Sequence, residues 1–215
     1  VISLDFELAL EKTKQANNLA ISLEDSSGKG EIILSNAQLH YYIESYDKAA
    51  KLNRAAIVQL KATQNSEKLA SALSLQGLIT TKLSEFSASE NYFKQANALY
   101  SISNNEAGKS SILLGRGILE FEKGNPKVAL NYLNAGVAKY REFEMSFQEA
   151  SGLIYKAKAL LQLEDDAEKT YLLQSKTALK DALLIIEAKN YKKLKIDSYQ
   201  IKANIAQKEG ESIKA

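Results

Sequence analysis

The chain has no cysteine and no tryptophan, and it contains only one proline and one histidine in 215 residues. Without cysteine it forms no disulfides or zinc–thiolate sites, and thiol catalysis is excluded. A single proline and 10 glycines argue against a disordered chain and against a sheet with many turns. The lack of cysteine is compatible with either the cytoplasm or the periplasm, so the compartment stays open.

A strong net charge and a long apolar run are also missing. Lys and Arg number 28 against 26 Asp and Glu, which gives a net charge of +2 and predicts no nucleic-acid partner. No apolar run reaches the roughly 18 residues of a membrane span, and no signal-peptide pattern opens the chain. We therefore expect a soluble segment that does not insert into a membrane.

The clearest pattern lies in residues 105–140, NEAGKSSILLGRGILEFEKGNPKVALNYLNAGVAKY. Apolar residues at helical spacing predict a helix over residues 110–123 and a second helix that carries Val128 to Tyr140. Gly124-Asn125-Pro126 predicts a tight turn between them. Glycine accepts the left-handed C-cap conformation, and proline suits the first turn of the next helix.

Small residues recur along the chain at intervals of 40 residues. The three columns are Ala37, Gly77, Gly117 and Ala157; Ala9, Ala49, Ser89 and Ala129; and Ala16, Ala56, Ala96 and Gly136. Small side chains let two antiparallel helices approach closely. One helix pair cannot bury its whole apolar face, so the repeat predicts pairs that stack on one another.

The second-helix pattern is clearest as Ser89-x-x-x-Phe93-x-x-Ala96. Together with the small residue of the first helix and the turn glycine, it resembles the tetratricopeptide repeat, over nearly the whole chain. The 40-residue period departs from the common one of about 34 residues and looks like the long-helix subclass of bacterial regulators and kinesin light chains. The Trp of the motif is absent. The resemblance implies an all-α, right-handed superhelix, a TPR-like solenoid.

The repeat register predicts a single solenoid domain over residues 1–215 with four complete helix pairs. The predicted pairs cover about residues 28–65, 66–105, 106–145 and 146–189. Partial repeats are expected at residues 1–27, with a helix over 3–23 and a turn at 26–30, and at residues 190–215. In the last one Ala203 continues the small column after a shift of 6 residues, and Gly210 is the expected turn. These partial repeats predict a segment of a longer protein.

Four stretches invite a chemical interpretation, but each has a simpler structural one. Residues 28–30, GKG, lack the preceding strand and the following Ser or Thr of a phosphate loop. His40 has no nucleophile beside it. The acidic stretch 164–168 lacks the glycine of a calcium loop, and the lysines of 190–195 are typical of a solvated helix face. We therefore predict no catalytic residue, no metal, no cofactor and no enzyme activity.

The resemblance also implies a binding groove, because first helices line the concave side of the tetratricopeptide superhelix. The predicted partner-binding residues are Gln38, Tyr41, Tyr42, Leu78, Thr81, Lys82, Leu114, Ile118, Phe121, Glu122, Ile154, Lys158 and Leu161. The paired Lys and Asn residues that hold a peptide C-terminus in chaperone cofactors of this family are missing. The apolar members suit an amphipathic helix or peptide, although half of them face the core if first helices are buried on two sides.

The predicted function is therefore non-catalytic binding of a protein or peptide. Long arrays of this kind resemble the sensory or scaffolding segments of larger bacterial signalling regulators. The alternative is a structural scaffold that self-associates, and a homodimer stays open. A monomer at every concentration would disfavour that alternative.

Overall fold

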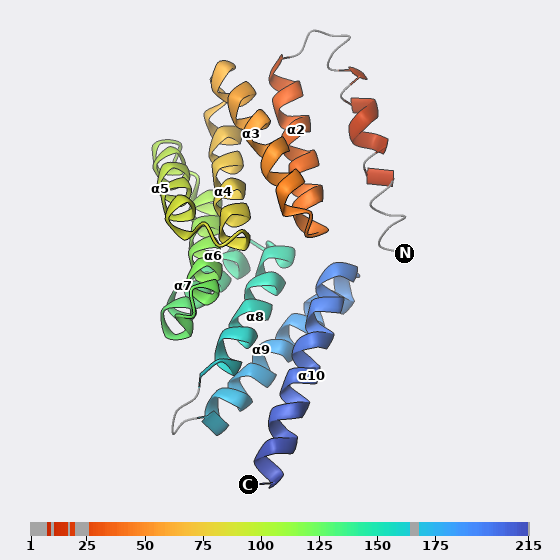
Figure 1. Cartoon of the computed structure of the whole chain (residues 1–215), viewed down its shortest axis with the longest axis vertical. Helices are drawn as coiled ribbons and strands as arrows, with labels where there is room; N and C mark the ends of the chain where they lie inside the picture. The colour runs from red at the N-terminus through yellow and green to blue at the C-terminus, as the bar shows by residue number, and fades with distance from the viewer. Residues whose placement is uncertain (1–7, 10, 17, 20–25, 164–167, 215) are drawn as a thin grey trace. The chain divides into compact units, whose positions relative to one another are not determined.

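The fold is all-α and consists of sequential antiparallel helix pairs in a solenoid-like helical repeat (Figure 1). The computed structural model describes residues 8–9, 11–16, 18–19, 26–163 and 168–214, and within these ranges all regular structure is helical. The helices are α2 (Ser26–Tyr42), α3 (Tyr46–Ala62), α4 (Ser66–Lys82), α5 (Phe86–Ile102), α6 (Glu106–Glu122), α7 (Pro126–Glu142), α8 (Ser146–Leu161), α9 (Glu168–Lys189) and α10 (Lys192–Lys214).

The helices from α2 to α8 begin at regular intervals of 20 residues, at positions 26, 46, 66, 86, 106, 126 and 146. Helices α2 to α7 have 17 residues each. The 40-residue period of the sequence is therefore two equal steps, one for a first helix and one for a second helix. The interval lengthens only from α9 onward.

The links between these helices share one backbone conformation. The middle residue of each link has a positive φ: Glu44 62°, Gln64 55°, Ser84 62°, Asn104 51°, Gly124 79° and Glu144 55°. In the first link the N–H of Glu44 donates to the carbonyl of Tyr41 (3.0 Å), and the N–H of Ser45 donates to that of His40 (2.9 Å). This is the Schellman pattern, which satisfies the last carbonyls of a helix. Ser45 is also the N-cap of α3, so one residue ends one helix and begins the next.

One of the three turns expected from glycine is confirmed, and two are wrong. Gly124 takes the left-handed conformation between α6 and α7, and Pro126 begins α7. Residues 26–30 instead form the start of α2. There Gly30 serves packing, because a Cβ atom would lie 3.0 Å from Cδ2 of Leu60. Helix α10 runs through Gly210 without a turn, since a helix tolerates one glycine at a cost of about 1 kcal/mol.

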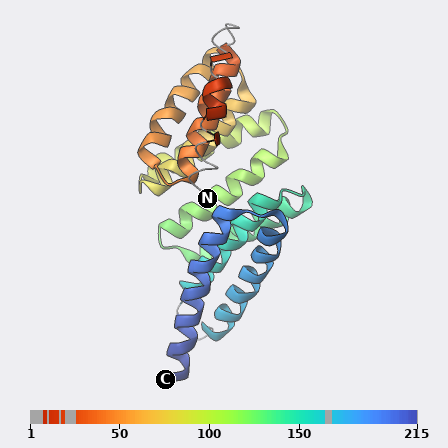
Figure 2. The same cartoon turned by 90° about the vertical axis from the view of Figure 1, so that its right-hand side faces the viewer.

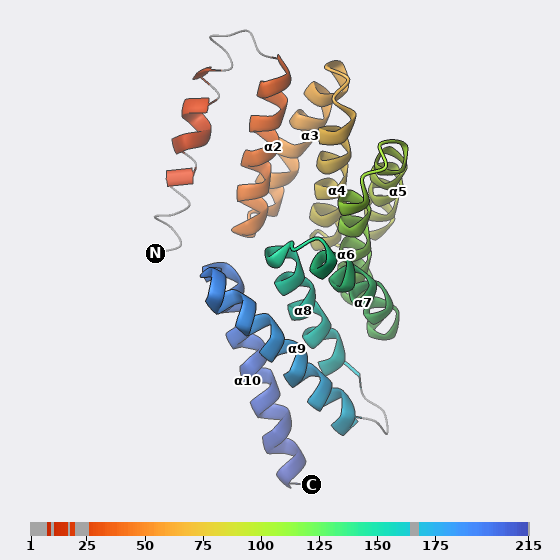
Figure 3. The same cartoon turned by 180° about the vertical axis from the view of Figure 1, so that it is seen from behind.

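The chain divides into two compact units, residues 1–115 and 116–215, and the boundary falls within α6. In the first unit α2 packs against α3, α3 against α4, and α4 against α5. In the second unit α7 packs against α8, α8 against α9, and α10 against both α8 and α9. Figures 2 and 3 show the same succession within each unit from two other sides. The single solenoid domain over residues 1–215 stays a prediction.

The glycines of the first small-residue column lie at helix crossings. A Cβ atom on Gly77 would lie 2.6 Å from the ring of Phe93, and one on Gly117 would lie 2.7 Å from Leu133. Phe93 and Leu133 are fully buried. Gly115 contacts the same Phe93 ring, so α5 places this ring between two glycines of α4 and α6. The prediction that small residues mark close helix contacts is confirmed.

A repeated hydrogen bond shows that the register survives the longer interval before α9. The Oγ of Ser89 donates to the carbonyl of Gly77 at 2.8 Å, and the Oγ of Ser175 donates to that of Ala157 at 3.0 Å. The carbonyl residues are 80 positions apart and the serines 86, which is two 40-residue steps plus the shift of 6. Helix α9 therefore packs on α8 as α5 packs on α4. Residues 164–167, where the shift falls, lie outside the described residues.

Among the described helices, none combines the length and the apolarity that crossing a membrane would require.

Candidate binding surface

Four of the predicted binding residues are buried between helices. They are Thr81 (1% exposed), Leu114 (9%), Ile118 (3%) and Ile154 (2%). The Thr81 hydroxyl donates to the carbonyl of Gly77 (2.8 Å) and lies 2.7 Å from Oγ of Ser89. First helices are covered on two sides, so these side chains pack the interior and do not face solvent.

In the first unit the surface positions of α2 lie beside a group of tyrosines. Gln38 and Tyr42 are exposed, and Tyr41 is half-buried. The ring centroid of Tyr41 lies 6.0 Å from that of Tyr42 and 5.7 Å from that of Tyr46, the first residue of α3. On α4, Leu78 and Lys82 are half-buried. The sequence analysis did not single out Tyr46, although the short link after α2 brings it next to Tyr41.

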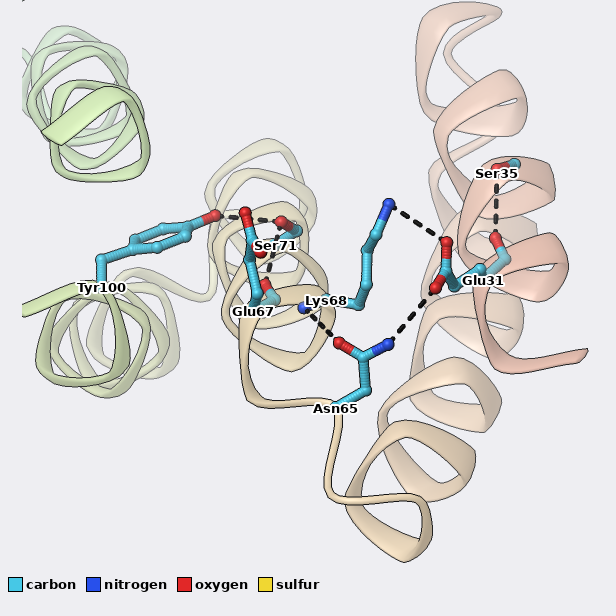
Figure 4. Close-up of polar contacts among 7 residues, drawn as sticks. All are labelled: Glu31, Ser35, Asn65, Glu67, Lys68, Ser71 and Tyr100. Carbon is cyan, nitrogen blue, oxygen red and sulfur yellow. Dashed lines mark hydrogen bonds and ion pairs between the residues drawn. The ribbon is translucent and has the colours of Figure 1, made fainter. Parts of the chain in front are cut away.

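Polar contacts join α2 to α4 near the N-terminal ends of the two helices (Figure 4). The carboxylate of Glu31 accepts from Nζ of Lys68 (3.1 Å) and from Nδ2 of Asn65 (3.2 Å). The Oδ1 of Asn65 accepts the backbone N–H of Lys68 (3.1 Å) and so caps α4. Glu31 and Lys68 remain largely exposed, so the ion pair contributes at most about 1 kcal/mol. The contacts align adjacent first helices.

Tyr100 of α5 connects α4 to α6 behind this polar edge. Its hydroxyl lies 3.1 Å from Oγ of Ser71, as Figure 4 shows, and its ring rests on Gly108. Burial raises the pKa of Tyr100, and the nearby charge of Glu67 acts in the same direction, while hydrogen bonds to Ser71 and Ser111 oppose the shift. The phenol therefore stays protonated near neutral pH and serves as a structural hydrogen-bonding group.

In the second unit two neighbouring first helices form a cluster that we call the aromatic cluster: Phe121 of α6 with Tyr155 and Lys158 of α8. The rings of Phe121 and Tyr155 meet edge to face, with centroids 5.8 Å apart. Nζ of Lys158 lies 5.1 Å from the Tyr155 centroid, within the range of a cation–π contact. All three side chains are half-buried. Of the predicted residues nearby, Glu122 is exposed, and Leu161 packs against the core of the unit.

Tyr155 was missed by the sequence analysis. It lies three residues before Lys158 on α8, and residues three apart share a helix face. That spacing was the available signal. The pairing with Phe121 was not available, because it depends on how α8 lies against α6.

The stretches that were set aside as chemical sites remain without support. His40 is 4% exposed, and its pKa is lowered by burial and by the charge of Lys48. Lys193 at the start of α10 pairs with Asp197 at 3.0 Å. Within the part of the chain that the structure describes, no three His, Cys, Asp or Glu residues gather closely enough to hold a metal ion.

Comparison with known protein families found no family model that matches the chain, and a search of curated proteins found no match.

Proposed function

We propose that the chain is a tetratricopeptide-type module that binds a protein or peptide and has no catalytic activity. We further propose that it is the sensory or scaffolding segment of a larger signalling regulator. The family assignment is supported by the paired helices, their regular interval and the small residues at the crossings.

The observation that carries the proposal is the aromatic cluster. Phe121, Tyr155 and Lys158 come from adjacent first helices, which are the helices that line the groove in this type of repeat. Half-buried aromatic rings are held in place by the core yet still present an apolar edge to solvent. Aromatic residues held in this way are enriched among the residues that dominate binding energy. A partner helix would place apolar side chains on the two rings.

A displayed library of amphipathic helices, selected on the immobilised chain, tests this proposal. We expect Phe121→Glu to weaken the selected helices at least about tenfold, which corresponds to the loss of one strong contact of about 1.4 kcal/mol. Val128→Glu is the matched control, because Val128 is 44% exposed on the second helix α7. This control should bind like the unmodified chain.

Circular dichroism of both variants must show unchanged helicity for this comparison to be valid. Equal affinity of Phe121→Glu and the unmodified chain for the selected helices would refute the proposal. So would a library from which no helix is selected.

A further inference from the structure

Helix α10 presents a first-helix face that the described residues leave uncovered. It begins at Lys192, 46 residues after the start of α8, and Asn190 before it has φ 55°, as Glu144 has before α8. The same step of 46 relates Ile196, Tyr199 and Ala203 of α10 to Ala150, Leu153 and Ala157 of α8.

Burial at these equivalent positions differs sharply between the two helices. On α8 the residues Ala150, Leu153 and Ala157 are 0%, 3% and 0% exposed, because they share a core cluster with α9. On α10 the side chain of Ile196 is 51% exposed and that of Tyr199 is 54% exposed, and Ala203 is exposed as well. The face of α10 that would receive a second helix is thus apolar and open.

A groove between α9 and α10 accompanies this face. It has a volume of about 450 Å³, and its apolar lining is Leu179, Leu183, Leu184, Ile205 and Ala206. One step of 46 earlier, Leu183 corresponds to Val137 and Ala206 to Leu160, which are 6% and 2% exposed. The groove is therefore open at positions that are closed in the preceding pair.

The N-terminal helical residues, 8–9, 11–16 and 18–19, show the complementary situation. One step of 40 relates Ala9, Thr13 and Ala16 to Ala49, Asn53 and Ala56 of α3, which are all 0% exposed. Ala16 is exposed, and Ala9 is half-buried. These residues have the register of a second helix whose small-residue face is not covered.

The opposite face of this N-terminal helix already packs as a second helix should. Oγ1 of Thr13 donates to Oδ1 of Asn36 on α2 at 2.7 Å. At the equivalent positions, Nδ2 of Asn53 on α3 donates to Oε1 of Gln76 on α4 at 2.9 Å. The N-terminal helix therefore contacts the first helix that follows it in the normal way and lacks only a first helix before it.

We propose that a second copy of this chain supplies the missing helix at each surface. The N-terminal helix of one copy lies on the open face of α10 and in the groove beside it, and together they complete one helix pair. Ala9 then lies opposite Ala203, as Ser89 lies opposite Gly77 and Ser175 opposite Ala157. Two different surfaces meet, so the contact is head-to-tail, and each added copy leaves both surfaces available again.

Sedimentation velocity of the 215-residue chain over a hundredfold range of concentration tests the proposal. The unmodified chain should form larger species as the concentration rises. Ala203→Glu and Ala16→Glu should each stay monomeric, because each buries a charge in the contact. Both positions are exposed and helical, and glutamate is a good helix former, so both variants should keep their helicity. Ala135→Glu, at an exposed position within α7, is the matched control and should assemble normally.

An equimolar mixture of the two variants gives the sharpest result. Ala16→Glu keeps an intact α10 face and Ala203→Glu keeps an intact N-terminal helix, so the mixture should form a dimer and nothing larger. The proposal is overturned if the unmodified chain stays monomeric throughout, if either variant still assembles, or if the mixture remains monomeric. This outcome does not depend on the aromatic cluster, so it is separate from the test of peptide binding.

Discussion

At the scale of single residues, the left-handed position in each link shows what the backbone requires and what the sequence supplies. Only Gly124 avoids the steric cost of positive φ, which is about 1–2 kcal/mol for other residues. Glu44, Gln64, Ser84 and Glu144 adopt it nonetheless. The two hydrogen bonds of the Schellman pattern and the next helix fix the conformation from both sides. Local residue preference is therefore a weak guide to these links.

Two glycines should respond to alanine in opposite ways. Gly124→Ala should lower the free energy of unfolding by about 1 kcal/mol, because alanine is strained at φ 79°. Gly210→Ala should raise it by about 0.5 kcal/mol, because Gly210 is helical and has open space around it. Urea unfolding measures both. A loss of stability in Gly210→Ala would contradict the continuous helix α10.

His40 should make the stability of the protein depend on pH between about 5.5 and 7.5. Burial and Lys48 lower its pKa in the folded state, whereas the unfolded value is about 6.5. Protonation therefore favours unfolding. The stabilising effect is complete above pH 6.5 and is lost as the pH falls toward the lowered pKa of the folded state.

Urea midpoints at pH 7.5 and 5.5 check this expectation. The unmodified chain should lose stability between them, and His40→Gln should lose clearly less. His40 is the only histidine, and ordinary carboxylates titrate at lower pH. Identical pH dependence in the two proteins would exclude His40 as the cause.

At the scale of helices, the sequence predicted the crossings better than it predicted the helix ends. Small residues 40 positions apart correctly placed Gly77 and Gly117 against Phe93 and Leu133, because a close approach leaves no alternative to a small side chain. The turn expected at residues 26–30 failed, since a glycine chosen for packing looks the same in sequence as a glycine chosen for a turn.

The same limit applies to the candidate site. Leu114, Ile118 and Ile154 lie on first helices, as predicted, but they are buried. A first helix contacts neighbours on two sides, so its apolar residues outnumber those of a one-sided amphipathic helix. Periodicity alone could not separate core positions from surface positions. The contact between Phe121 and Tyr155 depends on the packing of α8 against α6, which no local pattern encodes.

The crossing of α4 and α5 should show strong coupling between its two partners. Gly77→Ala alone should lower the free energy of unfolding by about 1–3 kcal/mol, because the new methyl group overlaps the Phe93 ring. In the double variant with Phe93→Leu, the smaller side chain relieves this overlap. A double-mutant cycle should therefore give a favourable coupling energy of about 1 kcal/mol. Additive effects would mean that the glycine is not required by the ring.

At the scale of the whole molecule, stability is spread over contacts between helices that are neighbours in the sequence. Each described contact joins helices one or two places apart, such as α3 with α4 or α8 with α10. In such an array the stability approximates a sum of repeat and interface contributions. A weakened interface should therefore loosen its own neighbourhood before distant helices respond.

Hydrogen exchange can test this locality with one substitution in each unit. Phe93→Leu removes part of a fully buried ring in α5, and Ile186→Val removes one methyl group from α9, where Ile186 is 1% exposed. Each should cost about 1 kcal/mol, which corresponds to roughly fivefold faster exchange of the affected amides. With Phe93→Leu the acceleration should appear in α4 and α5, while α8 and α9 keep their protection. With Ile186→Val the pattern should reverse. Equal acceleration in all helices for both variants would show that the chain opens as one cooperative body, which contradicts nearest-neighbour stabilisation.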